Sequence, residues 1–204
     1  MKAEISHEKM QFWFYWTILS FVLIPLTYIF SLIVVLLVHG AFGFTQMEGG
    51  TYLSQTVMQI AGGATIGLGT GLYQRSLLRK VFNVNSSWIY TLVIGFASTE
   101  LVVCLILWQL GINRYELRFI EFNPLPESLI FACAGLLIGL LQWIILKRYF
   151  SRSIYWVVAS TLSWGTCILI TRISIWLFFP GALIYGAITG AAFMWILKRK
   201  EENQ

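Results

Sequence analysis

The sequence contains no aspartate, only two histidines, and few charges of either sign. Charged residues make up 11% of its 204 residues, whereas a soluble domain carries about 25%. A nucleophile with its base, or a set of metal ligands, is hard to assemble from two isolated histidines, His7 and His39, and so few carboxylates. The composition therefore argues against a soluble enzyme, and we expect no catalytic residue, no cofactor and no metal site.

Reactive motifs are missing as well. There is no H-E-x-x-H, no G-x-S-x-G and no P-loop. The three cysteines, Cys104, Cys133 and Cys167, lie inside apolar stretches and form no C-x-x-C pair. They are typical of small buried hydrophobic residues rather than of a disulfide framework.

Long apolar runs dominate what is present, since 58% of the residues are hydrophobic. A helix needs about 20 apolar residues to cross a bilayer. The first run is too long for a cleavable signal peptide, so we expect it to remain as an anchor. The sequence predicts an all-α integral membrane protein, with residues 1–204 forming a single domain of six transmembrane helices. The predicted spans are 12–38, 56–74, 88–110, 128–146, 155–178 and 181–197.

Basic residues alternate between the predicted loops. Eleven of them flank the first span or follow the even-numbered spans, whereas the opposite side has only Arg114 and Arg118. The positive-inside rule then places the N- and C-termini in the cytoplasm. Because the net charge of +5 comes from the ends of spans, nucleic-acid binding is a poor interpretation.

The chain also repeats itself. A shift of 68 residues lays 64–108 over 132–176 without a gap, with eleven identical positions. A shift of 51 lays 186–199 over 135–148 in part. Repeats at a fixed spacing indicate one structural unit used several times. We predict units at about 56–110 and 128–178, and a partial third unit at 181–200.

The predicted units are helical hairpins that run in parallel about an axis along the membrane normal. The last two helices are expected to join through a tight turn at Phe179-Pro180-Gly181. The first span has the orientation needed to complete the third hairpin. The sequence thus suggests a pseudo-threefold bundle in which the first span closes against the last.

Small residues recur every fourth position in the even-numbered spans, and positions four apart share a helix face. We interpret them as seams where helix backbones approach closely; the alternative is a wall of small residues beside a ligand cavity. Gln74 and Gln142 occupy equivalent places and are candidates for hydrogen bonds between helices or for ligand contacts. The glycines of the seams are Gly63, Gly67, Gly71, Gly135, Gly139, Gly186 and Gly190.

Glu100 is the sharpest single candidate, because a carboxyl group near the middle of a span is costly unless it is paired, neutral or hydrated. The repeat aligns Arg172 one helical turn away from it, and Thr99 is adjacent. These residues form either a structural ion pair, a site that handles a ligand or proton, or two unrelated features in which Arg172 extends outward and Glu100 is protonated.

The segment from Gly135 through Gln142-Trp143 to Lys147-Arg148, followed by Tyr155-Trp156, resembles a repeated G-x-x-x-G-x-x-Q-W-x-x-L-(K/R)-(K/R) motif of bacterial multi-span membrane proteins. The first copy departs from the motif at Arg75, and the third has no glutamine. The resemblance implies a multi-span fold in the bacterial cytoplasmic (inner) membrane and adds nothing on function. In size and span number alone, the chain is similar to the membrane subunits that bind substrate in energy-coupling-factor vitamin transporters.

These observations favour a non-enzymatic membrane protein that acts as a packing, assembly or interaction subunit. Its expected partners are the lipid bilayer and either another membrane protein or a second copy of the chain. The alternative is a transporter of small molecules or ions, or a membrane substrate-binding subunit, with a site near Glu100 and Arg172. An intramembrane enzyme is the third hypothesis.

Overall fold

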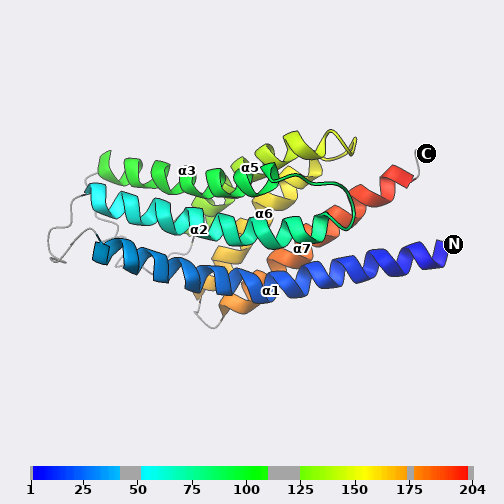
Figure 1. The fold of residues 1–204 in the computed structure, drawn as a ribbon, viewed down its shortest axis with the longest axis horizontal. Helices are drawn as coiled ribbons and strands as arrows, with labels where there is room; N and C mark the ends of the chain where they lie inside the picture. Colours follow the sequence, from blue (N-terminus) through cyan, green and yellow to red (C-terminus); the bar gives the residue numbers. More distant parts are fainter. Residues whose placement is uncertain (1, 42–51, 110–124, 174–176, 202–204) are drawn as a thin grey trace.

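A computed structural model describes residues 2–41, 52–109, 125–173 and 177–201. Within these ranges the secondary structure is entirely helical, which confirms the all-α class. Figure 1 shows long helices packed side by side, with both termini at the same end. The helices are α1 (Lys2–Ala41), α2 (Tyr52–Leu78), α3 (Ser87–Gln109), α5 (Leu125–Leu146), α6 (Tyr155–Ile173) and α7 (Phe178–Glu201).

Four segments of the described residues are long and apolar enough to cross a membrane: Met10–Ala41, Ser87–Gln109, Ser128–Leu146 and Phe178–Leu197. The helix α6 contributes a shorter apolar stretch, Tyr155–Thr171. The helix α2 is long, but it is not among the four. Its glycines, threonines and glutamines lower its mean hydropathy.

Two of the differences from the sequence-based expectation are the largest. The helix α1 begins at Lys2, ten residues before the predicted span, and its 40 residues extend about 60 Å at 1.5 Å per residue. The predicted turn at Phe179-Pro180-Gly181 is wrong, because α6 ends at Ile173 and these residues form the first turn of α7. Proline fits there, since the first N–H groups of a helix have no partner within it.

The predicted outward segments fall mostly outside the described residues. Residues 39–55 separate the first two predicted spans; of these, residues 39–41 end α1 and residues 52–55 begin α2. Arg114 and Arg118, between the third and fourth predicted spans, lie outside the described residues, which end at Gln109 and begin again with α5 at Leu125.

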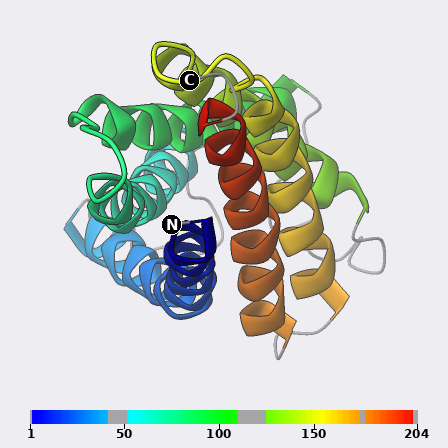
Figure 2. The ribbon, with the colours of Figure 1, turned by 90° about the vertical axis from the view of Figure 1, so that its right-hand side faces the viewer.

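The helices form a closed ring (Figure 2). Each packs against two neighbours, in the order α1, α2, α3, α5, α6 and α7, and α7 packs against α1. The last contact joins helices from opposite ends of the chain. One example is the Trp13 indole, which donates a hydrogen bond to the Ala187 carbonyl at 3.2 Å.

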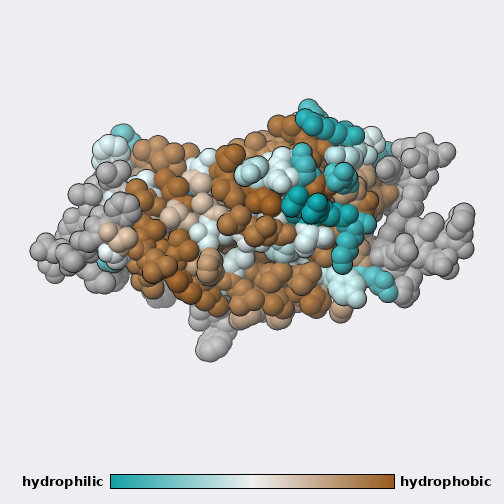
Figure 3. Space-filling model, in the orientation of Figure 1, coloured by the Kyte–Doolittle hydropathy of each residue, from teal (hydrophilic) through white to brown (hydrophobic). Residues whose placement is uncertain are grey.

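The molecule is apolar outside as well as inside. Large hydrophobic side chains such as Leu36, Tyr90 and Leu129 are more than 60% exposed. Figure 3 shows an apolar surface along most of the molecule, while hydrophilic residues gather toward the end at which the termini lie. Such a surface suits a lipid environment rather than water, so the structure agrees with a membrane protein.

Candidate functional site

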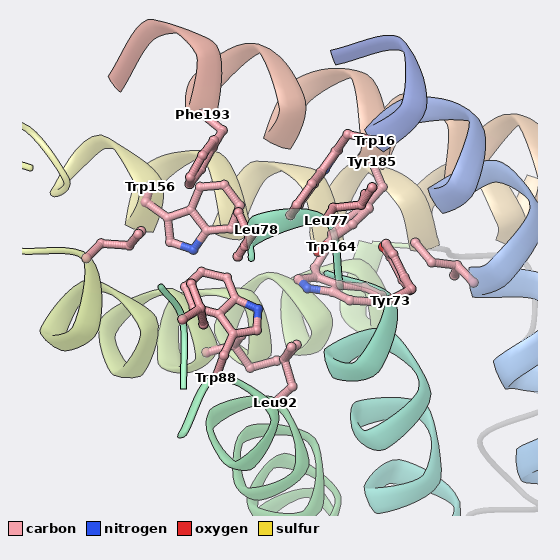
Figure 4. Packing of buried hydrophobic residues seen from close by; sticks show 14 of the residues in the cluster. Trp16, Tyr73, Leu77, Leu78, Trp88, Leu92, Trp156, Trp164, Tyr185 and Phe193 are labelled. Atoms are coloured by element: carbon pink, nitrogen blue, oxygen red, sulfur yellow. The ribbon is translucent and has the colours of Figure 1, made fainter. Parts of the chain in front are cut away.

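A layer of hydrogen-bonded indoles lies in the centre of the ring (Figure 4). The Trp88 Nε1–H of α3 donates to Gln74 Oε1 of α2 at 3.0 Å. The Trp156 Nε1–H of α6 donates to Gln142 Oε1 of α5 at 2.7 Å. Each pair spans 14 residues of chain, and the two pairs lie 68 positions apart. Both glutamines predicted as site residues are thus buried partners of a tryptophan.

Helices α1 and α7 hold a third indole in a different way. The Trp16 Nε1–H donates to the Thr189 hydroxyl at 2.9 Å. Phe193, which the 51-residue shift aligns with Gln142, stacks on Trp16 with ring centroids 6.1 Å apart and planes at 6°. Sequence reasoning missed Trp16. Only a short sequence pattern indicates it: Trp16-x-x-x-Ser20 in α1 matches Trp156-x-x-x-Ser160 in α6.

The three indoles contact one another through Trp156. Its ring centroid lies 6.2 Å from that of Trp16 and 5.9 Å from that of Trp88. All three side chains are 1% exposed or less. Edge and tilted contacts are the geometry that aromatic rings prefer. We call Trp16, Trp88, Trp156 and Phe193 the aromatic layer.

The two glutamines differ in how their second polar group is used. Gln74 Nε2 donates to the Tyr185 hydroxyl of α7 at 2.9 Å, so Gln74 joins three helices. Gln142 Nε2 is buried and has no hydrogen-bond partner among the described residues. An unpaired polar group in the interior costs free energy, and the cost is higher where the local dielectric constant is low.

A second short chain of polar groups lies beside Gln74. The Tyr73 and Ser20 hydroxyls are 3.1 Å apart, and Ser20 also donates to the Trp16 carbonyl at 2.8 Å. This chain connects α1 to α2 at a fully buried position. Together with Gln74, it fixes the register of neighbouring helices.

The glycines of the predicted seams lie against neighbouring backbones. A Cβ atom built on Gly67 would be 2.5 Å from the Leu92 carbonyl oxygen, and one on Gly135 would be 2.5 Å from that of Ser160. Both contacts fall within a hairpin and lie 68 positions apart. Close backbone approach through small residues is a main source of helix association in lipid. Cβ atoms on the other seam glycines, Gly63, Gly71, Gly139, Gly186 and Gly190, would all come within 3.0 Å of an atom of a neighbouring helix.

Glu100 lies at the α2–α3 contact. Its side chain is half-buried, and its Cγ would be 2.9 Å from a Cβ on Gly63. The neighbouring Thr99 hydroxyl donates to the Gly95 carbonyl of its own helix at 2.8 Å. Arg172 belongs to α6, but its side chain lies outside the described part of the chain. The predicted Glu100–Arg172 pair therefore stays a prediction.

The described residues offer little else that could hold a ligand. No three of their His, Cys, Asp or Glu side chains are placed to hold a metal ion. A hollow of about 230 Å³ lies on α1, lined by Met10, Gln11, Phe14 and Tyr15. It contains none of the predicted site residues.

Comparison with known proteins adds no assignment: no family model, no curated protein and no solved structure matches the chain. The function must therefore be inferred from the residues and their geometry.

Proposed function

We propose that the chain is an integral membrane protein with six spans and both termini in the cytoplasm, resident in the bacterial inner membrane. In this proposal it acts as a packing and assembly subunit that associates with another membrane protein or a second copy, and it catalyses no reaction. The charge asymmetry of the sequence supports the orientation, and the apolar exterior supports the lipid environment.

The aromatic layer is the observation that carries the proposal. In membrane transporters the substrate site lies near the bilayer midplane and opens to water from one side at a time. Here Trp16, Trp88 and Trp156 meet in the interior with 1% exposure or less. Trp88 and Trp156 are the second residues of α3 and α6, so these rings in contact leave no room for a solute near the end of the bundle that carries the short connections, which favours a packing role over transport.

Glu100 favours one alternative, a transporter of small molecules or ions or a membrane substrate-binding subunit. Its carboxyl group is half-buried at a helix contact, and ionisable groups at such depth mark ion or substrate pathways in many membrane proteins. The two functions differ in one observable property, the access of water to the interior.

Cysteine labelling tests both topology and water access. In a variant without native cysteines, single substitutions are made at two interior positions (Leu92→Cys, Ile138→Cys) and at three loop positions (Lys80→Cys, Arg152→Cys, Arg118→Cys). Intact cells are treated with a membrane-impermeant maleimide. We expect labelling at position 118 and protection at 80 and 152. Labelling of 152 from outside would contradict the six-span orientation.

The interior positions then separate the two functions. Leu92 and Ile138 are 1% exposed or less. A packing protein should therefore protect cysteines at both positions from the impermeant reagent, in right-side-out vesicles and in inverted vesicles alike. A transporter should admit the reagent from at least one face. Denatured samples, in which every single cysteine must react, control for reagent quality.

Assembly is tested separately by extraction from the native membrane in mild detergent. The proposal expects the chain to migrate with a stoichiometric second membrane subunit or a second copy. A monomer both in native extracts and after cross-linking in the membrane would contradict it.

A further inference from the structure

Two connections at one end of the bundle carry a dense group of cations. Five exposed basic side chains lie on the chain between α2 and α3 or between α5 and α6. Neither connection contains an acidic residue. We call these five residues the basic platform; they are Arg79, Lys80, Lys147, Arg148 and Arg152.

The connections are joined to each other. The Tyr149 hydroxyl donates to the Asn83 carbonyl at 3.2 Å. Phe82 packs against Tyr149 and Phe150, with ring centroids 5.1 and 5.3 Å apart. Residues 79–86 and 147–154 therefore form one surface at the end where the termini lie (Figure 1).

Two of the cations lie over aromatic rings. Lys147 Nζ lies 5.0 Å from the centroid of the Trp143 ring, and the Arg152 guanidinium carbon lies 5.9 Å from that of Trp195. Contacts between a cation and a ring face are attractive at these distances. Tryptophan and tyrosine are enriched at the depth of lipid headgroups, so the platform has the side chains expected there.

Exposed apolar side chains lie beside the cations on these connections and at the first residue of α6. Val81 is 38% exposed, Ile154 is 46% exposed and Tyr155 is 49% exposed. A nucleic acid or an acidic soluble protein would cover the cations but gain little from these apolar neighbours. A phospholipid can contact both the cations and the apolar side chains, because its phosphate binds the cations while its acyl chains lie along the helices.

We propose that the basic platform binds the headgroup of anionic phospholipids from the membrane leaflet that it faces. The proposal rests on the membrane function above and adds a lipid class to it. The headgroup phosphate is bound by cations from both connections at once, so it links the α2–α3 hairpin to the α5–α6 hairpin. An anionic lipid therefore stabilises the bundle more than a zwitterionic lipid does.

The test uses the purified full chain in a non-ionic detergent, titrated with phosphatidylglycerol or phosphatidylcholine. Binding is measured by native mass spectrometry and by the shift of the melting temperature. We expect phosphatidylglycerol to bind more tightly and to raise the melting temperature more, and we expect high salt to reduce the difference. Equal binding of the two lipids would overturn the proposal.

Charge-removing variants locate the site. Arg79→Gln/Lys80→Gln should weaken phosphatidylglycerol binding by about 25-fold, at about fivefold for each lost charge. The triple variant Lys147→Gln/Arg148→Gln/Arg152→Gln should weaken it by about 100-fold. The matched control, Arg114→Gln/Arg118→Gln, removes two charges that the sequence predicts on the opposite side of the membrane and should change binding by less than about twofold. Helix content by circular dichroism identifies any variant that does not fold. If the control weakens binding as much as the platform variants, net charge rather than this surface is responsible.

Flotation separates this proposal from the membrane function. The full chain is reconstituted separately with phosphatidylcholine vesicles and with vesicles that contain phosphatidylglycerol, and both samples are centrifuged in a density gradient. Flotation with no preference for phosphatidylglycerol would refute the lipid site and leave the membrane function standing. Failure to float with either lipid would refute both. Tight binding of a short RNA or a polyglutamate peptide by wild type, lost in the platform variants, would assign the surface to a soluble partner instead.

Discussion

The hairpins α2–α3 and α5–α6 differ from the pair α7–α1 in how each holds its central tryptophan. In the hairpins a glutamine amide accepts the indole N–H. In the pair α7–α1 a threonine hydroxyl accepts it, and Phe193 takes the place of the glutamine and stacks on Trp16. The same buried indole can therefore be satisfied by an amide, or by a shorter acceptor combined with ring stacking.

The difference follows from geometry within the chain. The two hairpins are continuous, with a connection that sets the glutamine and tryptophan 14 residues apart. The α7–α1 pair comes from opposite ends of the sequence, 173 residues apart at Trp16 and Thr189. No short connection fixes their register, so side-chain packing must do so. The stacking of Phe193 on Trp16 and the hydrogen bond from the Trp13 indole to the Ala187 carbonyl supply that packing.

The largest expected effect comes from adding a side chain at the close backbone contacts of the two hairpins. Gly67→Ala and Gly135→Ala should each destabilise the bundle by about 1–3 kcal/mol. The new Cβ would lie 2.5 Å from a backbone carbonyl oxygen, which cannot move without the helix. Gly190→Ala in the α7–α1 pair should cost less, because its nearest neighbours are the side chains of Trp13 and Trp16. Thermal unfolding in detergent measures the ranking.

Gly40→Ala is the matched control for these glycine variants. No atom of a neighbouring helix lies within 4 Å of a Cβ at Gly40, and alanine favours a helix more than glycine does. Its melting temperature should be unchanged or raised. If Gly67→Ala behaves like Gly40→Ala, the hairpin seam is not a tight contact.

An intermediate effect should distinguish the two glutamines. Gln74→Leu leaves the Trp88 N–H and the Tyr185 hydroxyl without their partner and should cost about 2 kcal/mol. Gln142→Leu removes an Nε2 that is already unpaired and leaves only the Trp156 N–H without a partner. It should cost about 1 kcal/mol or less, in the range of interhelical hydrogen bonds in membranes. Equal melting temperatures for the two variants would contradict the asymmetry.

Much of the fold follows from the sequence because hydrophobic runs and small-residue spacing are local signals. The predicted start of the third span differs from that of α3 by one residue. The predicted first span begins ten residues after the start of α1, because the largely polar residues before Phe12 continue the helix beyond the apolar run that hydropathy detects. The turn at Pro180 was misplaced, since proline is as compatible with a first helical turn as with a loop.

The candidate site was only half predictable. Gln74 and Gln142 stood out because the repeat aligns them, and their partners Trp88 and Trp156 were among the identical positions. The pairing itself needs the three-dimensional hairpin. Trp16 lies outside the aligned region, and its role depends on contact between the first and last helices. Glu100 was selected for its charge in an apolar run, and its contact with Gly63 could not be read from that pattern.

The smallest expected effect is a difference between two tryptophan variants. Trp156→Phe and Trp16→Phe remove the same atoms from buried positions, so their loss of packing is matched. Trp156→Phe leaves Gln142 with both amide atoms unpaired. Trp16→Phe leaves Thr189 with its other hydrogen bond, in which its hydroxyl donates to the Tyr185 carbonyl at 2.7 Å. Trp156→Phe should therefore be the more destabilising by about 0.6 kcal/mol, the average for an interhelical hydrogen bond in a membrane protein.

Chemical unfolding in mixed micelles resolves a difference of that size when both variants are measured side by side. The double variant Trp156→Phe/Gln142→Leu provides the control. Because it removes both partners, the N–H and the amide, it should be no less stable than Trp156→Phe alone. A double variant that is less stable by the full cost of Gln142→Leu would show that the indole and the amide act independently. The α5–α6 hairpin would then hold its tryptophan by packing alone.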